Sequence, residues 1–105
     1  MSSTTPSQGL LGSTALSANT ASILTYVVQS NNRTLYLNGT TSNSDSPTGG
    51  TSTYANVGRL GDDTSNNQFW NGQMAEILVY NRALSSAELT TVHRYLGARY
   101  AVSVP

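Results

Sequence analysis

The chain has 105 residues, no cysteine and a formal net charge of zero. This length favours one domain with a modest core, and the lack of cysteine excludes disulfides and thiolate metal sites. All five basic residues are scattered arginines. Because they form no cationic stripe that could hold a phosphate backbone, we expect no nucleic-acid partner. No apolar run is long enough to predict a membrane span.

The first 20 residues are rich in Ser and Thr and contain Pro6 and two glycines, a composition typical of a linker. We expect this leader to be disordered or to form one short strand around Leu10–Leu16. The folded domain is accordingly predicted to span residues 21–105.

Short strands joined by tight turns are predicted after the leader. Ile23–Gln29 and Arg33–Leu37 are rich in apolar and β-branched residues, and Ser30–Asn32 between them is typical of a turn. Asn38-Gly39 is the strongest hairpin signal in the chain, because both residues accept positive φ. The partner strand is expected to start with Thr40–Ser42.

Farther along, a long surface loop is expected over residues 44–53, which include two adjacent glycines. Another strand is predicted at Tyr54–Leu60, followed by a polar loop at Gly61–Asn67. Gln73–Tyr80 is largely apolar on both alternating faces and too short for a helix of its own. It therefore predicts a strand that is covered on both sides.

A helix is predicted after this strand. Ser85 is a good N-cap, and Glu88 three residues later completes a capping box. Leu84 and Leu89 have the spacing of a hydrophobic staple. The apolar stripe of the helix is predicted to consist of Leu89, Val92, Leu96 and Tyr100. A last short strand is expected at Ala101–Val104.

Three runs of the sequence carry a resemblance to a known family. They are RTLYLNG at Arg33–Gly39, NGQMAEILVYNRALSSAEL at Asn71–Leu89 and YLGARY at Tyr95–Tyr100. These runs resemble the C-terminal blocks of the laminin-G-like jelly rolls in the concanavalin A-like lectin and glucanase superfamily, and they stand in the same order. The resemblance covers about residues 23–100, and it implies a fold more than a ligand.

The predicted fold class is therefore all-β, an antiparallel β-sandwich of the concanavalin A-like jelly-roll type, truncated, with one C-terminal α-helix packed on the sheet. The resemblance matches the second half of the family module. A half-sandwich leaves an apolar sheet face and a strand edge open. We expect a homo-oligomer whose copies cover these surfaces, with a reduced sandwich that folds on itself as the alternative. This interpretation requires Gln73–Tyr80 to pair with a neighbouring strand.

Asp62, Asp63 and Asn66 belong to the predicted polar loop and offer the hard oxygen ligands that Ca²⁺ requires. Calcium is the candidate cofactor, and the resemblance supports it, because many concanavalin A-like modules hold calcium near their loops. The other role of such residues, and the commoner one, is to form turns through hydrogen bonds to their own backbone.

Trp70 is the candidate platform for a sugar ring, since the CH face of a pyranose stacks on an exposed aromatic side chain. Asn67, Asn71 and Tyr54 are the other candidate ligand-binding residues around it. The alternative, which the family pattern favours, is that Trp70 or its neighbour Phe69 packs into the core.

Glu76 lies within an apolar predicted strand, where a carboxylate needs partners. We expect a structural role, with bonds to the backbone, Arg82 or Arg59. The laminarinase-type glucanases of the superfamily place three carboxylates along one strand. Leu78 and Asn81 stand where the other two would be, so the carboxylate pair that glycoside hydrolysis needs is missing, and no catalytic residue is predicted.

The only histidine, His93, borders the helix stripe and is expected to be a half-buried, hydrogen-bonded packing residue. The leading hypothesis for function is a non-catalytic carbohydrate-binding or adhesion module of a larger protein. The resemblance implies an extracellular or cell-surface location for that protein. A structural unit without sugar specificity is the second hypothesis. The third is a small metal-assisted hydrolase that uses Glu76, His93 and the Asp62/Asp63 loop.

Overall fold

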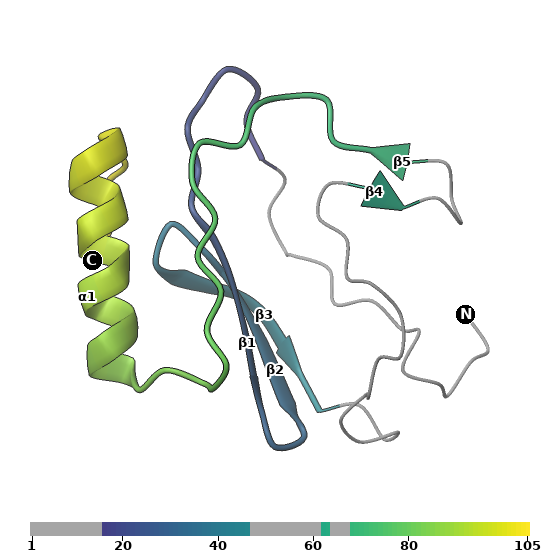
Figure 1. Ribbon diagram of the computed structural model, residues 1–105, viewed down its shortest axis with the longest axis vertical. Helices are drawn as coiled ribbons and strands as arrows, with labels where there is room; N and C mark the ends of the chain where they lie inside the picture. Colours follow the sequence, from purple (N-terminus) through teal and green to yellow (C-terminus); the bar gives the residue numbers. More distant parts are fainter. Residues whose placement is uncertain (1–15, 47–61, 64–67) are drawn as a thin grey trace.

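The computed structural model describes residues 16–46, 62–63 and 68–105. Within these residues the chain forms a three-stranded sheet, a two-stranded hairpin and one helix (Figure 1). The elements are β1 (Leu24–Gln29), β2 (Asn32–Leu37), β3 (Thr40–Asp45), β4 (Asp62–Asp63), β5 (Gln68–Phe69) and α1 (Ser86–Tyr100). The predicted strand at 54–60 lies outside the described residues.

The three-stranded sheet is an antiparallel meander in the order β1-β2-β3. Asn38 and Gly39 both have positive φ, at 52° and 82°, which confirms the predicted tight turn between β2 and β3. Asn38 also closes the far end of the sheet, because its backbone N–H donates to Ile23 O at 2.8 Å and its side-chain Oδ1 accepts from Ile23 N at 2.8 Å. The first two predicted strands are thus confirmed.

β3 is longer than predicted and reaches Asp45. Its end is fixed by Arg33, which lies directly opposite Asp45 in the register and forms a two-point ion pair with it. The hydrogen bonds from Arg33 hold the pKa of the Asp45 carboxyl below its usual range. Leu35 lies opposite Asn43 but its neighbour Tyr36 lies opposite Thr41, so β3 carries one extra residue here, a β-bulge.

The strand predicted at Gln73–Tyr80 is wrong for this structure. These residues have no strand conformation and pair with none of the described strands. The strands of the meander are joined by local turns and need no distant partner. The segment 73–80 could form a strand only with a distant partner strand. Its Glu76 is instead held by side chains of α1. The strand expected at Ala101–Val104 is also absent from the structure, because the chain turns there to end the helix.

Both ends of α1 are capped. The Ser85 hydroxyl accepts from Glu88 N at 3.2 Å, and the Glu88 carboxylate accepts from Ser85 N at 2.8 Å, so the predicted capping box is confirmed. Ala101 adopts the left-handed region, with φ of 57°. Val102 N then donates to Gly97 O at 2.9 Å, the bond that ends a helix in a Schellman motif.

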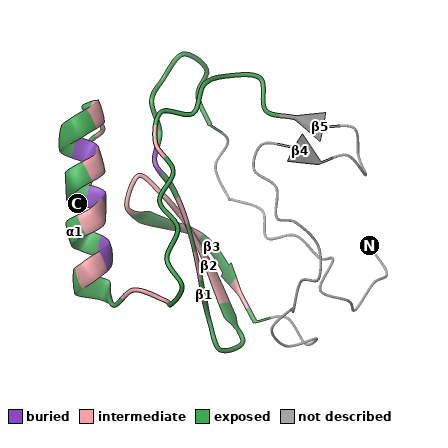
Figure 2. Cartoon of the chain, viewed as in Figure 1, coloured by how far each residue is buried: buried purple, intermediate pink, exposed green. Residues whose placement is uncertain are grey.

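The core lies between α1 and one face of the sheet (Figure 2). Its buried members are Ile23 before β1 and Leu89, His93 and Gly97, which are spaced four apart along the helix. The predicted stripe is confirmed in part, since Val92, Leu96 and Tyr100 flank this row and are half-buried. An all-β sandwich is not seen in the described residues, which form an antiparallel sheet covered on one side by a helix.

No helix in the described part of the chain has both the length and the apolar character needed to cross a bilayer.

Candidate functional site

Trp70 is the predicted ligand-binding residue whose surroundings the structure shows most fully. Its side chain is 48% exposed, so Trp70 itself does not pack in the core, and the burial of Phe69, the other candidate, lies outside what the structure describes. A Cβ on Gly72 would lie 3.1 Å from three atoms of the indole. The ring therefore lies close against the backbone of Gly72, and a larger residue there would push it by a few tenths of an ångström. Asn71 between them is exposed, while Asn67 and Tyr54 lie outside the described residues.

The acidic residues predicted to bind calcium do not lie in a loop. Asp62 and Asp63 form β4, which pairs with β5 through Phe69 and Gln68, because backbone bonding between these short segments gives them strand conformation. Asn66 lies outside the described residues. The described part of the chain contains no cluster of three or more acidic or histidine side chains able to hold a metal.

Glu76 is bound by the last turns of α1. Its carboxylate accepts hydrogen bonds from Tyr100 Oη at 2.8 Å and Tyr95 Oη at 3.2 Å, and Arg99 Nε lies 3.3 Å away. The structural role predicted for Glu76 agrees with this arrangement, but its predicted partner Arg82 is wrong. Arg82 pairs with Glu88 instead. Sequence reasoning missed the three partners because they lie 19 to 24 residues away.

His93 joins α1 to the sheet. It is 4% exposed, and its Nε2 lies 2.8 Å from Thr25 Oγ1 on β1. Its ring also packs against Tyr36 on β2, with centroids 5.7 Å apart and planes tilted by 55°. Burial lowers the pKa of His93 below its ordinary value of 6.5, because the charged form loses its water. The expected packing role is confirmed, and the residue is more deeply buried than predicted.

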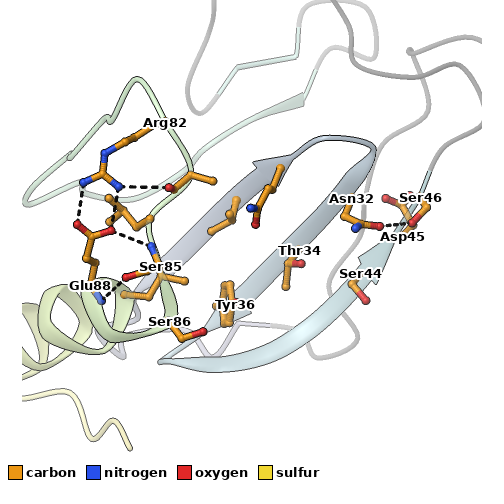
Figure 3. Close-up of a pocket in the computed structure, with 15 residues that line it drawn as sticks. Asn32, Thr34, Tyr36, Ser44, Asp45, Ser46, Arg82, Ser85, Ser86 and Glu88 are labelled. Carbon is orange, nitrogen blue, oxygen red and sulfur yellow. Dashed lines mark hydrogen bonds and ion pairs between the residues drawn. The ribbon is translucent and has the colours of Figure 1, made fainter.

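A groove of about 740 Å³ opens on the helix-facing side of the sheet, beyond the part that α1 covers (Figure 3). One wall is the segment 82–89 before and within the first turn of the helix, and the floor comes from the three strands. Figure 3 shows Asn32, Thr34 and Tyr36 along β2, with Ser44 beside them on β3. Sequence reasoning missed this groove. Polar residues alternate with apolar ones along part of β2 and fill β3, but neither pattern by itself marks a binding site.

The wall of the groove is rigidly built. Arg82 and Glu88 form a two-point ion pair, with N–O distances of 2.8 and 2.7 Å. These bonds, together with the Ser85 N–H, lower the pKa of Glu88 to about 2. The carboxylate is thus charged at all ordinary pH values, and it has its partners in the wall itself.

The opposite face of the sheet has no cover among the described residues. Leu24, Tyr26 and Val28 alternate along β1 with the helix-facing residues and are 57%, 55% and 39% exposed. Leu35 and Leu37 lie opposite Tyr26 and Leu24 on β2, so they belong to the same face. We call this set of five residues the outer face.

Comparisons with known proteins agree with the meander and helix. One solved structure that resembles this chain is an S-layer domain-containing protein from Clostridium thermocellum, with a TM-score of 0.54 and 19% sequence identity. The likeness covers 78% of this chain but only 43% of the solved one. No curated protein sequence matches the chain.

A laminin-G family model, described as the concanavalin A-like lectin/glucanases superfamily, matches residues 1–90. The match includes the first 20 residues, which the sequence composition sets apart as a leader; that division stays a prediction. Because the model covers most of the sequence, this chain belongs to the concanavalin A-like lectin/glucanase superfamily.

Proposed function

We propose that this chain is a non-catalytic carbohydrate-binding or adhesion module of a larger extracellular protein. Membership of a lectin-like superfamily and the S-layer domain named for the similar structure support an extracellular parent. The observation that carries the binding role is the half-exposed indole of Trp70. An aromatic ring that is fixed in place and open to solvent can stack on a sugar without a large loss of side-chain freedom.

The arrangement of Glu76 supports a role without catalysis. Its two oxygens are engaged by Tyr95, Tyr100 and Arg99, so this carboxylate holds the segment 73–80 against α1. A general acid or nucleophile has to reach the bond that is cleaved. Removing the charge with Glu76→Gln should therefore weaken the fold rather than abolish a turnover.

Calcium at the Asp62/Asp63 hairpin remains part of the proposal, with Asn66 as its third predicted ligand. Asp62 lies opposite Phe69 in the register of β4 and β5, next to Trp70 in the chain, so an ion bound by these residues would order the segment that presents the indole. Calorimetric titration with Ca²⁺ tests this. Binding that is lost in Asp63→Asn would support the site, whereas no heat and no rise in Tm would dismiss it.

A glycan array tests the binding role. Trp70→Ala should lose array binding, and Tyr80→Ala is the matched control, because Tyr80 is also a half-exposed aromatic, at 50%, in the segment that follows. Losing one stacking ring should weaken a sugar contact about tenfold or more. A wild-type protein that binds no glycan on the array would overturn the proposal.

Self-association is a second proposed property, and it is favoured by the outer face. An apolar sheet face that stays exposed is an association surface. Within the described part of the chain β1 is also an edge strand, which could pair with a strand of another copy. The occupant we propose is a second copy of the same chain. With a net charge of zero, two copies do not repel each other, and like faces can meet about a two-fold axis.

A further inference from the structure

The floor of the groove between the sheet and the segment 82–89 differs from the part of the sheet that α1 covers. The half of the sheet under α1 packs with Ile23, Thr25 and Tyr36 against the helix. Beyond that half, the floor changes to uncharged polar side chains. They are Gln29, Asn32, Thr34, Ser44 and Ser46.

Several of these polar groups have unused hydrogen-bonding capacity. The side chains of Gln29, Thr34 and Ser44 form no hydrogen bond with another residue in the described part of the chain. Asn32 and Ser46 bond to each other through Oδ1 and Oγ, which leaves the Asn32 amide N–H groups available. The floor therefore offers hydroxyl and amide groups that both donate and accept.

The charged groups at the groove are already satisfied. Glu88 is held by Arg82, and Asp45 is held by Arg33, so neither pair presents a net charge to a ligand. An anionic ligand would have to compete with both carboxylates for their arginines. An uncharged ligand that carries many hydroxyls matches the lining without displacing either pair.

The apolar part of the groove completes this match. Val27 on β1 and Leu84 on the wall, both half-buried, place carbon surface beside the hydroxyl-rich floor. A volume of about 740 Å³ lies within the range of roughly 300–1,000 Å³ that small-molecule sites occupy. Sugars combine hydroxyl edges with apolar CH faces, which is the same combination.

We infer that this groove is a second binding site, separate from Trp70, and that its ligand is an uncharged oligosaccharide. The inference rests on the proposed carbohydrate-binding role and assigns it a place on the helix-facing side of the sheet. Thr34 and Ser44 bind the sugar hydroxyls, and Gln29 and Asn32 bind from the turn end of the groove.

The experiment uses the intact chain, labelled with ¹⁵N, and a set of probe sugars. The uncharged probes are cello-, malto-, xylo- and galacto-oligosaccharides, and the charged probes are sialylated and sulfated oligosaccharides. Titration should shift the side-chain amide signals of Gln29 and Asn32 for at least one uncharged probe. Signals from Trp70 report on the other site in the same spectra.

A double variant, Thr34→Val with Ser44→Ala, removes two hydroxyls and leaves shape nearly unchanged. Affinity for the uncharged probe should fall about tenfold. The matched control is Thr40→Val with Ser103→Ala, two exposed residues outside the groove lining, and it should bind as the wild type does. Equal Tm values confirm that the compared variants are folded. If the double variant does not fold, the amide shifts of Gln29 and Asn32 in the wild type still test the groove.

Each outcome separates the two proposals. Shifts at Gln29 and Asn32, with weaker binding by the double variant alone, support the groove. Binding that moves only Trp70, or that only Trp70→Ala weakens, overturns the groove and leaves the carbohydrate-binding role intact. Binding of charged probes alone also overturns the groove assignment. If neither class of sugar binds, the proposed function itself fails and the groove assignment fails with it.

Discussion

The two faces of the three-stranded sheet differ although they are built from the same strands. On one face, Thr25 bonds to His93 of the helix, and Leu89 is buried behind it. On the other face, Leu24 and Tyr26 are more than half exposed. Adjacent residues of β1 thus have opposite environments, as the two-residue period of a strand requires.

This difference shows which parts of the fold are complete within the described residues. Where α1 lies over the helix-facing side, the sheet has its cover, a part-buried hydrogen bond and a capped helix. The outer face has apolar residues of the kind that proteins bury, but the described residues supply nothing to bury them. We therefore expect substitutions on the first face to change the stability of one chain, and substitutions on the second to change its association.

The largest expected effect is that of Leu89→Ala. Leu89 is 8% exposed between α1 and the sheet, and truncating a buried leucine costs about 2–5 kcal/mol of unfolding free energy. The matched control is Leu24→Ala on the outer face, which should cost less than about 1 kcal/mol in dilute protein, where copies do not associate. Denaturant unfolding measures both, and equal losses would contradict the contrast between the faces.

Gly97→Ala should be the next in size. A Cβ at this position would lie 2.7 Å from the backbone oxygen of Val102, which cannot move aside without opening the helix end. Overpacking costs about 1–3 kcal/mol, and because the clash is with backbone we expect the upper end of that range. The net loss is then about 2 kcal/mol, after subtraction of the about 1 kcal/mol that alanine gains over glycine in a helix. If thermal unfolding shows Gly97→Ala to be stabilising, the close packing of the last helical turn is wrong.

Ser85→Ala should have a smaller effect, because it removes the hydroxyl that caps Glu88 N. Losing an N-cap costs about 0.5–2 kcal/mol. Ser86→Ala is the matched control, since Ser86 is already inside the helix and exposed. Circular dichroism on heating compares the two, and the capping box would be refuted if both variants melted alike.

The smallest effect is a pH dependence that His93 produces. Its pKa is lowered in the folded chain by burial, so the unfolded chain binds the proton more tightly. The contribution of neutral His93 is therefore complete above its ordinary pKa of 6.5 and is lost progressively as the pH falls below that value. Melting curves from pH 8 to about pH 5 should show this fall. His93→Gln should flatten the dependence of Tm on pH. If the slope is unchanged in this variant, another group causes the pH dependence.

Features that depend on neighbouring residues were predicted well from the sequence, and contacts between residues far apart in the chain were not. Asn38-Gly39 and the Ser85–Glu88 box act within a few residues, so both were confirmed. Gln73–Tyr80 has the composition of a strand, but a strand exists only with a partner, and composition does not name one. The partners of Glu76 and His93 were hidden for the same reason, since they come from residues far along the chain.

The candidate sites show the same contrast between what residue types predict and what only the fold determines. Trp70 could be selected from its residue type alone, but its half-exposed position and the close approach of Gly72 to its ring are visible only in the structure. The groove could not be selected, because no single residue in it is unusual. It results from the register that sets Thr34 beside Ser44 and from the angle at which the segment 82–89 approaches the sheet.

The central claim is that the outer face is an association surface, and light scattering on size-separated protein tests it most directly. We predict that the wild type has at least twice the mass of one chain and that the variant Tyr26→Ser with Val28→Thr has the mass of a single chain. The control pair Tyr80→Ser with Val79→Thr removes exposed apolar groups outside the outer face, at 50% and 85% exposure, and should associate as the wild type does. A wild type that is strictly monomeric and unfolds cooperatively would contradict the claim.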